Sequence, residues 1–498
     1  MLMENTARPT ACIVGAGLGG LATSVRLAAQ GFRVTVFESG PSAGGKATWF
    51  EQAGYTFDAG PSLFTLPELV DDLFAVAGED PAAFEYAEES IACRYFWNDG
   101  LHFEAPAEPK QFAQAASEIF GEDAGRVLKY LDEAAHAYQH FGKVFLENPL
   151  NEFSTWTNLR TLKLAKEIFR VDLLGTMDSH NRRAFNNPKL VQLFNRFATY
   201  NGSDPYRAPG LLTMIPHLEH GVGSFFPKGG IRAIPRVLQQ LAEKMGVEFH
   251  FNKTVEQIEV AERAAKGVLV DGVSHSFDLI VSNMDVVPTY RRLLPNQPAP
   301  EKTLSQERSS SALIFYWGIA KEFSKLGLHN IFFADDYRAE FDGLFSSKAP
   351  SPDPTVYIHI SSKCEATDAP YGKENWFVMI NAPHDANVNW DDYKARAREA
   401  ILKKLSERLG DDVESLIETE ATLSPPEIEA KTHSYRGALY GAASNNKFAA
   451  FLRHPNRTSR IDRLLFVGGS VHPGGGIPLV LLSAKIAADA AKKYFITK

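Results

Sequence analysis

The sequence predicts an α/β protein with a Rossmann-like sheet, and three observations support this fold class. Near the start of the chain, an apolar strand-like segment meets closely spaced glycines, and a helix-like segment follows. A second strand–glycine–helix segment stands near the other end. The chain has 498 residues, 44% of them hydrophobic and 22% charged, which is enough for two or three domains with a large core.

Charge and cysteine content exclude several classes of protein. The formal net charge is −8 and the sequence pI is near 6.0, which argues against a nucleic-acid partner. Cys12, Cys93 and Cys364 show no CxxC spacing, so we expect neither a disulfide framework nor a metal cluster. The start, MLMENTARPT, lacks a signal-peptide pattern, and no apolar run reaches the ~18 residues of a membrane span. We therefore expect a cytoplasmic protein.

The first segment, ACIVGAGLGGLATSVRLAAQGFRVTVFE (11–38), has the pattern of a dinucleotide-binding βαβ unit. Gly15 makes the tight turn, Gly17 lets a pyrophosphate approach the backbone, and Gly20 lets the helix pack closely on the strand. The second strand ends in Glu38, at the usual distance for an acid that binds ribose hydroxyls. An ordinary βαβ turn without a nucleotide is the alternative interpretation.

Three further glycine-rich segments favour FAD over NAD. GGK (44–46) follows the second strand directly, and DAGPS (58–62) comes shortly after it. The third, within RLLFVGGSVHPGGGIPLVLLSAKIAADAAKKYF (463–495), is followed by a helix-like run whose N-terminus would stabilise the negative charge of a reduced flavin. His472, in this last segment, either takes part in catalysis or packs within its loop.

Together these segments resemble the FAD-dependent amine-oxidase superfamily, and within it the bacterial carotenoid (phytoene-type) desaturases. GVGSFFPKGGIRAIPRVL and VSNMDVV, in the middle of the chain, add to the resemblance. DAGPSLFTLP and the stretch 201–221 look like the hydroxycarotenoid 3,4-desaturase branch. At 469–471 the chain has Gly-Ser-Val where an Ala/Gly-Thr stretch is frequent, which bears on the branch and not on the cofactor.

The cofactor-binding residues follow from the glycine-rich segments and from positions that the resemblance adds, such as a backbone contact of Val255 with the adenine. The predicted residues are Gly15, Ala16, Gly17, Leu18, Gly19, Gly20, Glu38, Ser39, Gly44, Gly45, Lys46, Gly60, Pro61, Ser62, Val255, Asn283, Gly468, Gly469, Gly476, Ile477 and Pro478.

The resemblance also implies the domain organisation. A Rossmann-like FAD-binding domain of the GR2-type flavoprotein fold would be assembled from 1–90, 220–300 and 455–498. An α+β substrate-binding domain would take 91–219 and 301–454. In the middle of the chain, the pattern predicts a helix over about 231–244, one alternating strand over 247–260 and a further strand over 279–285.

Residues 156–174, WTNLRTLKLAKEIFRVDLL, form a basic amphipathic pattern when placed on a helix. Such a helix can lie in a membrane interface. A surface helix packed on a core is the alternative. Because the implied substrate dissolves in lipid, we expect peripheral association with the inner face of the cell membrane.

The resemblance implies a desaturase that introduces C=C bonds into an acyclic carotenoid, with hydride transfer to flavin N5 and loss of a proton. Glu219 is the candidate proton acceptor, and a structural ion pair is its alternative role. Since the chain shows no second dinucleotide fingerprint, oxygen or a quinone would accept the electrons. We expect no protein partner. The alternative functions are a redox-neutral carotenoid cis-trans isomerase and a flavin-free prenyl-binding chaperone of the same fold.

Overall fold

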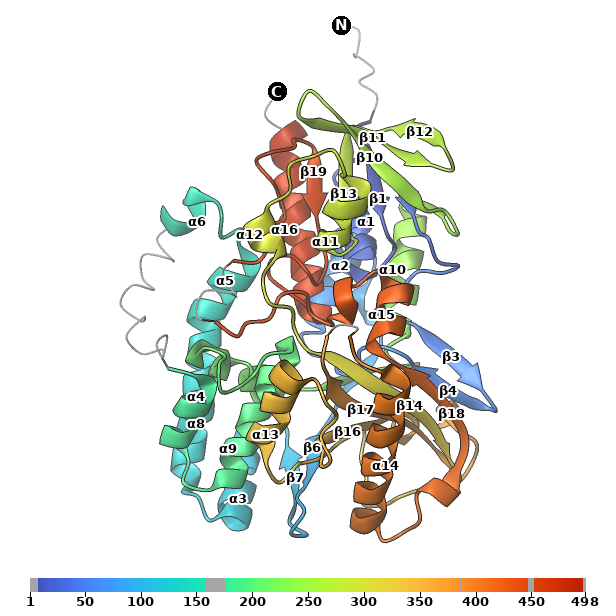
Figure 1. Ribbon diagram of the computed structural model, residues 1–498. Coiled ribbons are helices and arrows are strands. Elements are labelled where there is room, and N and C mark those ends of the chain that lie inside the picture. The colour runs from blue at the N-terminus through green and yellow to red at the C-terminus, as the bar shows by residue number, and fades with distance from the viewer. Residues whose placement is uncertain (1–7, 158–174, 385–386, 447–451, 496–498) are drawn as a thin grey trace, which may run out of the picture.

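A computed structural model describes residues 8–157, 175–384, 387–446 and 452–495 (Figure 1). Two large sheets organise this part of the chain. A parallel sheet lies in the upper half of Figure 1, near both termini, and a mixed sheet lies in the lower half. Helices cover both sheets, and a separate group of helices stands at the left of the figure.

The parallel sheet has five strands in the order β19-β13-β1-β2-β9. The central strand is buried over residues 11–14, because helices pack around the sheet and leave it no contact with water. Every strand comes from one of the ranges 1–90, 220–300 and 455–498. The strands are β1 (Thr10–Val14), β2 (Arg33–Phe37), β9 (Glu248–His250), β13 (Leu279–Ser282) and β19 (Leu464–Phe466). The helices that share its core are α1 (Leu18–Ala29), α2 (Glu68–Ala77), α10 (Ala233–Lys244) and α16 (Ile477–Phe495).

The mixed sheet has seven strands in the order β18-β14-β17-β16-β15-β6-β7. All nine residues of its strand 311–319 are buried, and they alternate between two cores. Odd-numbered residues from 313 to 319 pack with α14 (Trp390–Leu409), while Ala312, Ile314 and Tyr316 face the opposite side. The strands are β6 (Ile91–Phe96), β7 (His102–Pro106), β14 (Ser311–Ile319), β15 (His329–Phe332), β16 (Val356–Ile360), β17 (Glu374–Ala382) and β18 (Ile417–Leu423).

The remaining helices and strands connect or cover these sheets. The helices at the left of Figure 1 are α3 (Pro109–Phe120), α4 (Ala124–Ala137), α5 (Lys143–Glu147), α6 (Phe153–Thr157), α8 (Met177–Ala184) and α9 (Pro188–Asn195). The short helices elsewhere are α11 (Val286–Pro288), α12 (Glu301–Leu304), α13 (Tyr337–Asp342) and α15 (Pro425–Thr432). The small sheets are β3 (Trp49–Gln52) with β4 (Tyr55–Asp58), β5 (Tyr86–Glu88) with β8 (Phe225–Pro227), and β10 (Val255–Ala261) with β11 (Ala264–Val270) and β12 (Val273–Ser276).

The prediction of one strand over 247–260 is wrong. The segment is divided between β9 in the parallel sheet and β10 in a three-stranded antiparallel sheet. Asn252, between them, has a φ of +55°, which an extended strand does not tolerate. The N–H groups of Asn252 and Lys253 donate to the carbonyl oxygens of Gly40 and Glu38, so the turn is tied to the end of β2.

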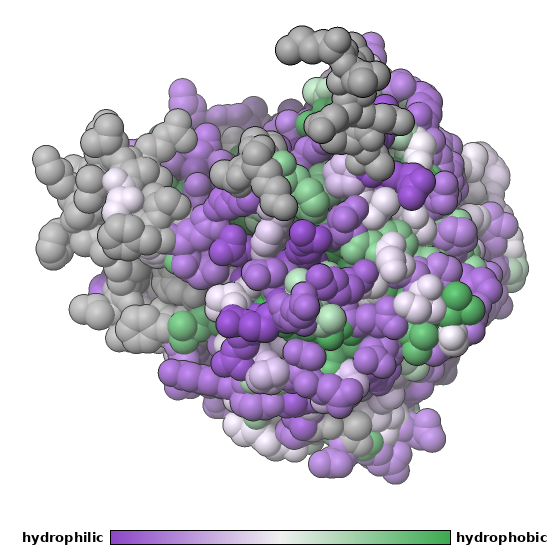
Figure 2. All heavy atoms as spheres, turned by 90° about the horizontal axis from the view of Figure 1, so that it is seen from above, coloured by the Kyte–Doolittle hydropathy of each residue, from purple (hydrophilic) through white to green (hydrophobic). Residues whose placement is uncertain are grey.

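The predicted membrane-associating helix, 156–174, lies outside the described residues except for Trp156 and Thr157. Among the helices that the structure describes, none is both long and apolar enough to cross a bilayer. On the face seen from above, hydrophilic side chains predominate and hydrophobic ones form small groups between them (Figure 2). Such scattered apolar groups are normal on a protein surface.

Candidate functional site

The first part of the site is the turn between β1 and α1. A Cβ on Gly20 would lie 2.1 Å from the carbonyl oxygen of Gly15, so only glycine lets the helix pack this closely. The N-cap residue of α1 is Gly17, and no side chain of the described residues caps the helix there. Its first N–H groups therefore remain available to an anion.

The predicted ribose acid lies beside this turn. One carboxylate oxygen of Glu38, Oε2, accepts the N–H of Ala16 at 2.7 Å, and the other, Oε1, accepts the N–H of Gly40 at 2.7 Å. These bonds hold the carboxylate where β1 and β2 end. Ligands of open parallel sheets bind at the carboxyl ends of the strands, and Glu38 lies at that edge of the sheet.

The C-terminal glycine segment lies against the N-terminal one. A Cβ on Gly19 would be 3.2 Å from the backbone nitrogen of Gly468 and 2.6 Å from Oδ1 of Asn283. The Nδ2 group of Asn283 also donates to the carbonyl oxygen of Gly15 at 3.3 Å. A Cβ on Gly468 would also lie 3.1 Å from Oδ1 of Asn283, so Asn283, directly after β13, lies between two glycine segments that are more than 400 residues apart in sequence.

One cavity of about 990 Å³ reaches both glycine segments. This volume lies at the upper end of the range that small-molecule sites occupy, about 300–1,000 Å³. Ala16 and Gly20 do not line it, since both are buried within the turn. All the other predicted site residues do: Gly15, Gly17, Leu18, Gly19, Glu38, Ser39, Gly44, Gly45, Lys46, Gly60, Pro61, Ser62, Glu219, Val255, Asn283, Gly468, Gly469, Gly476, Ile477 and Pro478.

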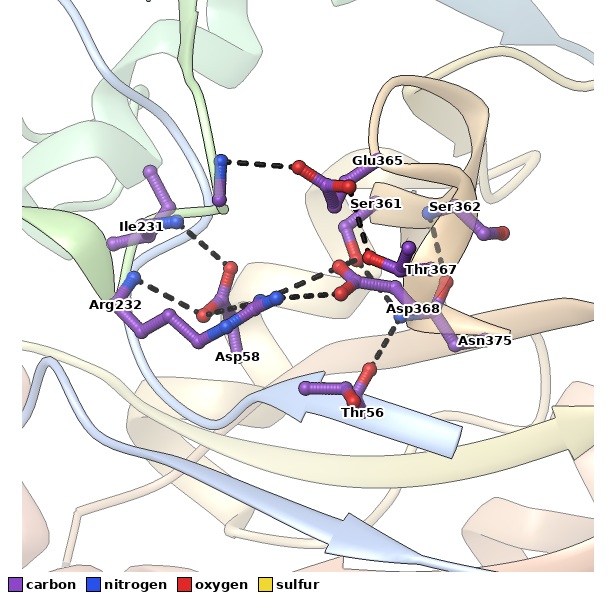
Figure 3. A network of polar contacts seen from close by, with 11 residues as sticks. Thr56, Asp58, Ile231, Arg232, Ser361, Ser362, Glu365, Thr367, Asp368 and Asn375 are labelled. Atoms are coloured by element: carbon purple, nitrogen blue, oxygen red, sulfur yellow. Dashed lines mark hydrogen bonds and ion pairs between the residues drawn. The ribbon is translucent and has the colours of Figure 1, made fainter. Parts of the chain in front are cut away.

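A buried polar network holds the loop that carries Gly60, Pro61 and Ser62 (Figure 3). Asp58, at the end of β4, accepts the N–H groups of Ile231 at 2.9 Å and Arg232 at 3.1 Å. The Arg232 guanidinium lies 3.4 Å from Asp58 and 2.6 Å from Asp368. These bonds just before α10 explain why that helix begins at Ala233 and not at 231 as predicted. Through Asp368 and Ser361, the network connects the residues just before α10 to Asn375 in β17 of the mixed sheet.

Away from the glycine segments, much of the cavity wall is apolar. One group of side chains belongs to the turns after α9, and another belongs to β14 and β17 of the mixed sheet. Their apolar atoms make this part of the cavity suitable for a long hydrocarbon. The residues are Leu211, Leu212, Met214, Ile215 and Leu218 in the turns, and Ala312, Ile314, Tyr316, Phe377 and Met379 in the strands.

Glu219 lines the cavity within a buried ion pair. Its Oε1 accepts a hydrogen bond from Nη2 of Arg196 at 2.6 Å, and its Oε2 accepts one from the Tyr200 hydroxyl. Burial alone would raise the pKa of Glu219, but the Arg196 charge and these hydrogen bonds outweigh it and hold that pKa below its usual value. A carboxylate that is held ionised in this way is a weaker base.

Two other candidate side chains in the cavity wall have defined partners. His472 Nε2 donates to the carbonyl oxygen of Asn148 at 2.9 Å, and burial lowers the pKa of His472 to about 4. His472 is thus bonded to the segment after α5, and not within its own loop as one interpretation had it. Lys46 Nζ donates to the carbonyl oxygen of Leu439 at 2.8 Å, and burial lowers the pKa of Lys46 to about 8.

Comparison with known proteins decides the family. A family model described as flavin containing amine oxidoreductase matches residues 18–316. A 1-hydroxycarotenoid 3,4-desaturase of a Flavobacterium species is 52% identical over 479 residues, which are 96% of this chain and 98% of the relative. This chain belongs to the flavin-containing amine oxidoreductase family. A second relative, a 4,4'-diapolycopene oxygenase of a Methylomonas species, is 32% identical over 96% of this chain and 97% of the relative.

Solved structures share the fold of this flavoprotein. Putrescine oxidase bound to putrescine is 14% identical, with a TM-score of 0.63 over 99% of this chain and 100% of that one. A Rab GDI from Plasmodium falciparum is 15% identical, with a TM-score of 0.51 over 84% and 89% of the two chains. At these identities the likeness concerns the fold alone. The predicted α/β flavoprotein fold is thereby confirmed.

The geometry of the site fits FAD. The N-terminus of α1 would supply N–H groups for the pyrophosphate, and the Glu38 carboxylate would bind the ribose. Gly476, directly before α16, has a φ of +100°, and a Cβ there would meet no atom within 4 Å. A side chain at this point would fill open space beside the cavity, so glycine leaves room for a flat ring.

Sequence reasoning missed several residues of the site. Arg196 and Tyr200 are the partners of Glu219, and Tyr440 and Arg453 also line the cavity. Arg196 stands 23 residues before Glu219, in a different turn of the chain. No local spacing indicates such a contact, because the turns between the two residues decide whether their side chains meet.

Proposed function

We propose that this flavoprotein is a carotenoid desaturase, which introduces C=C bonds into an acyclic carotenoid during carotenoid biosynthesis. The observation that carries the proposal is a single cavity that joins two glycine segments fit for FAD to an apolar wall fit for a long hydrocarbon. The name of the relative that is 52% identical, a 1-hydroxycarotenoid 3,4-desaturase, supports this substrate class.

FAD, when bound, supplies the acceptor for a hydride from the substrate. The contribution of the chain is to hold and orient the reacting carbons. Apolar side chains from β14 and β17 line one stretch of the cavity, and those of the turns at 210–218 line another. A polyene between them would be kept from water and restricted to few positions, which lowers the entropic part of the barrier.

The proton that leaves the substrate needs an acceptor, and Glu219 is the candidate in the cavity wall. Its ion pair with Arg196 keeps the carboxylate ionised and able to accept a proton, but makes it a weak base. The same contacts are those expected of a purely structural pair. The two roles of Glu219 predict different outcomes in the variants described in the Discussion.

Expression in cells that accumulate acyclic carotenes and their 1-hydroxy derivatives tests the proposal. We expect products with additional conjugated double bonds, visible by chromatography as longer absorption wavelengths and a mass lower by two hydrogens per step. Products of unchanged mass and altered cis/trans geometry would instead show the isomerase. Products that gain oxygen would show an activity like the one in the name of the Methylomonas relative, an oxygenase that is 32% identical.

We also propose oxygen or a quinone as electron acceptor and a position on the inner face of the cell membrane. The sequence contains one dinucleotide fingerprint, so NAD(P)H has no predicted site beside FAD. A carotenoid dissolved in lipid would reach the cavity from a membrane surface. A flavin-free prenyl-binding chaperone is disfavoured by the family and by the two glycine segments that meet at the cavity.

A further inference from the structure

Arg453 is a buried cation in the cavity wall, beside the C-terminal glycine segment. Only 7% of its surface is exposed. A Cβ on Gly474 would lie 3.3 Å from Nε of Arg453, so the guanidinium touches the turn that leads into α16. Its Nη1 group donates to the carbonyl oxygen of Tyr440 at 2.8 Å, another residue of the cavity wall.

Arg453 forms no ion pair with any carboxylate in the described part of the chain. There, its Nε and Nη2 groups also have no hydrogen-bond acceptor. The neighbouring charge that acts on it is another cation, Arg308, which is already paired with Asp285 at 2.5 Å. Burial and that like charge lower the pKa of Arg453 to about 10, so the guanidinium is still charged at neutral pH. An uncompensated buried charge is costly, and an anion in the cavity would offset the cost.

The position of Arg453 indicates which anion this is. The fingerprint turn and the N-terminus of α1 are already suited to the pyrophosphate. Arg453 stands at the other glycine segment, where the N-terminus of the 19-residue helix α16 adds positive potential. The flavin ring is neutral when oxidised. It gains one negative charge when a hydride, which is two electrons and one proton, is transferred to it.

We propose that Arg453 is the counter-charge for the reduced flavin ring. It would stabilise the reduced cofactor more than the oxidised one and thereby raise the midpoint potential of the bound FAD. This assignment rests on the family's flavin and not on the carotenoid substrate. Its test needs no carotenoid. A failure of the proposed desaturase function would therefore not contradict the role of Arg453, and a failure of the Arg453 proposal would not contradict the desaturase function.

The test compares Arg453→Gln and Arg453→Lys with the wild-type holoenzyme. The midpoint potential of bound FAD is measured by equilibration with reference dyes, and the dissociation constant of oxidised FAD by fluorescence. In Arg453→Gln, the ratio of the affinity for reduced FAD to the affinity for oxidised FAD should fall at least tenfold. The midpoint potential should then fall by at least about 30 mV. Arg453→Lys should recover part of this shift, and oxidised FAD should bind nearly as before.

A matched control is Arg26→Gln. Arg26 is similarly buried and pairs with Asp72 at 2.5 Å, but does not line the cavity. Its loss should lower the melting temperature without moving the potential. If Arg453→Gln does the same, the residue is structural and the proposal is wrong. If Arg453→Gln weakened the binding of oxidised and reduced FAD equally and left the potential unchanged, Arg453 would be assigned to the pyrophosphate. That outcome would also overturn the proposal.

Wild-type protein provides a test that does not depend on the variants folding. If the reduced ring is anionic near neutral pH, one proton accompanies two electrons. The midpoint potential should then fall by about 30 mV for each pH unit. A slope of about twice that value would mean that the reduced ring is neutral, and Arg453 would then have no negative charge to compensate.

Discussion

Glu219 and Arg196 show at the scale of single residues how the cavity tolerates charge. Both side chains are almost completely buried, at 2% and 7% exposure, and they neutralise one another at 2.6 Å. Removing one partner of such a pair is costly, about 3–5 kcal/mol, because the other charge stays buried without a partner. Removing both costs much less. This difference separates a structural role from a catalytic one.

Glu219→Gln should lower both the free energy of unfolding and turnover, since it leaves the Arg196 charge without its partner. In Glu219→Gln combined with Arg196→Met, stability should return towards the wild-type value while turnover stays low. Urea denaturation and product chromatography on FAD-loaded protein measure the two effects. Recovery of turnover along with stability in the double variant would show that Glu219 has only a structural role.

The same ion pair predicts a dependence of stability on pH. The folded-state pKa of Glu219 lies below its ordinary value of 4.5, so the pair contributes its stability above about that pH. The contribution is lost as the pH falls through the folded-state pKa. Wild-type protein should therefore lose more stability than Glu219→Gln on acidification below 4.5, as measured by melting temperature. Parallel curves for the two proteins would contradict this.

Packing of α1 against β1 is the contact between elements that shapes the FAD site. In Gly20→Ala, the new methyl group would approach the carbonyl oxygen of Gly15 to 2.1 Å, and backbone atoms cannot yield as a side chain can. The helix must then shift away from the turn. We expect FAD affinity to fall at least tenfold, measured by fluorescence. Gly343→Ala is the control, because its Cβ would meet only ordinary contacts at 3.9 Å.

The network in Figure 3 connects β4 and α10 to the turns before β17. Arg232→Gln would leave two buried carboxylates, Asp58 and Asp368, without their shared cation. We expect a loss of about 3–5 kcal/mol in urea denaturation. Lys228→Gln, which breaks an exposed pair with Glu85, should have little effect. A small loss in Arg232→Gln would mean that the two sheets are held together by other contacts.

At the scale of the whole molecule, the proposed membrane position is tested with liposomes of anionic lipid. Leu162→Glu with Phe169→Glu, in the predicted amphipathic segment, should release the protein in a flotation assay, because the apolar face would carry charge. The control, Ile119→Glu with Val273→Glu, changes exposed apolar residues elsewhere and should still float. Unchanged flotation of the first variant would show that 156–174 is not the anchor.

The nucleotide-binding unit could be predicted because its parts are close in sequence. Strand, glycines, helix and Glu38 follow one another within residues 11–38, and local backbone preferences decide each of them. The strand prediction over 247–260 failed for a related reason. Its alternating pattern is real, but the turn at Asn252 is stabilised by hydrogen bonds to residues around 40, which no local pattern contains.

The sequence by itself determined the strand–glycine–helix segments near both ends, from which a dinucleotide site is predicted, because glycine spacing and strand–helix periodicity are local properties. Only the tertiary structure decided that Asn283 lies between those segments, that Glu219 meets Arg196, and that Arg453 faces the cavity without a carboxylate among the described residues. Charge pairing acts over a few ångströms in space. Residues far apart along the chain come that close only through the packing of whole elements.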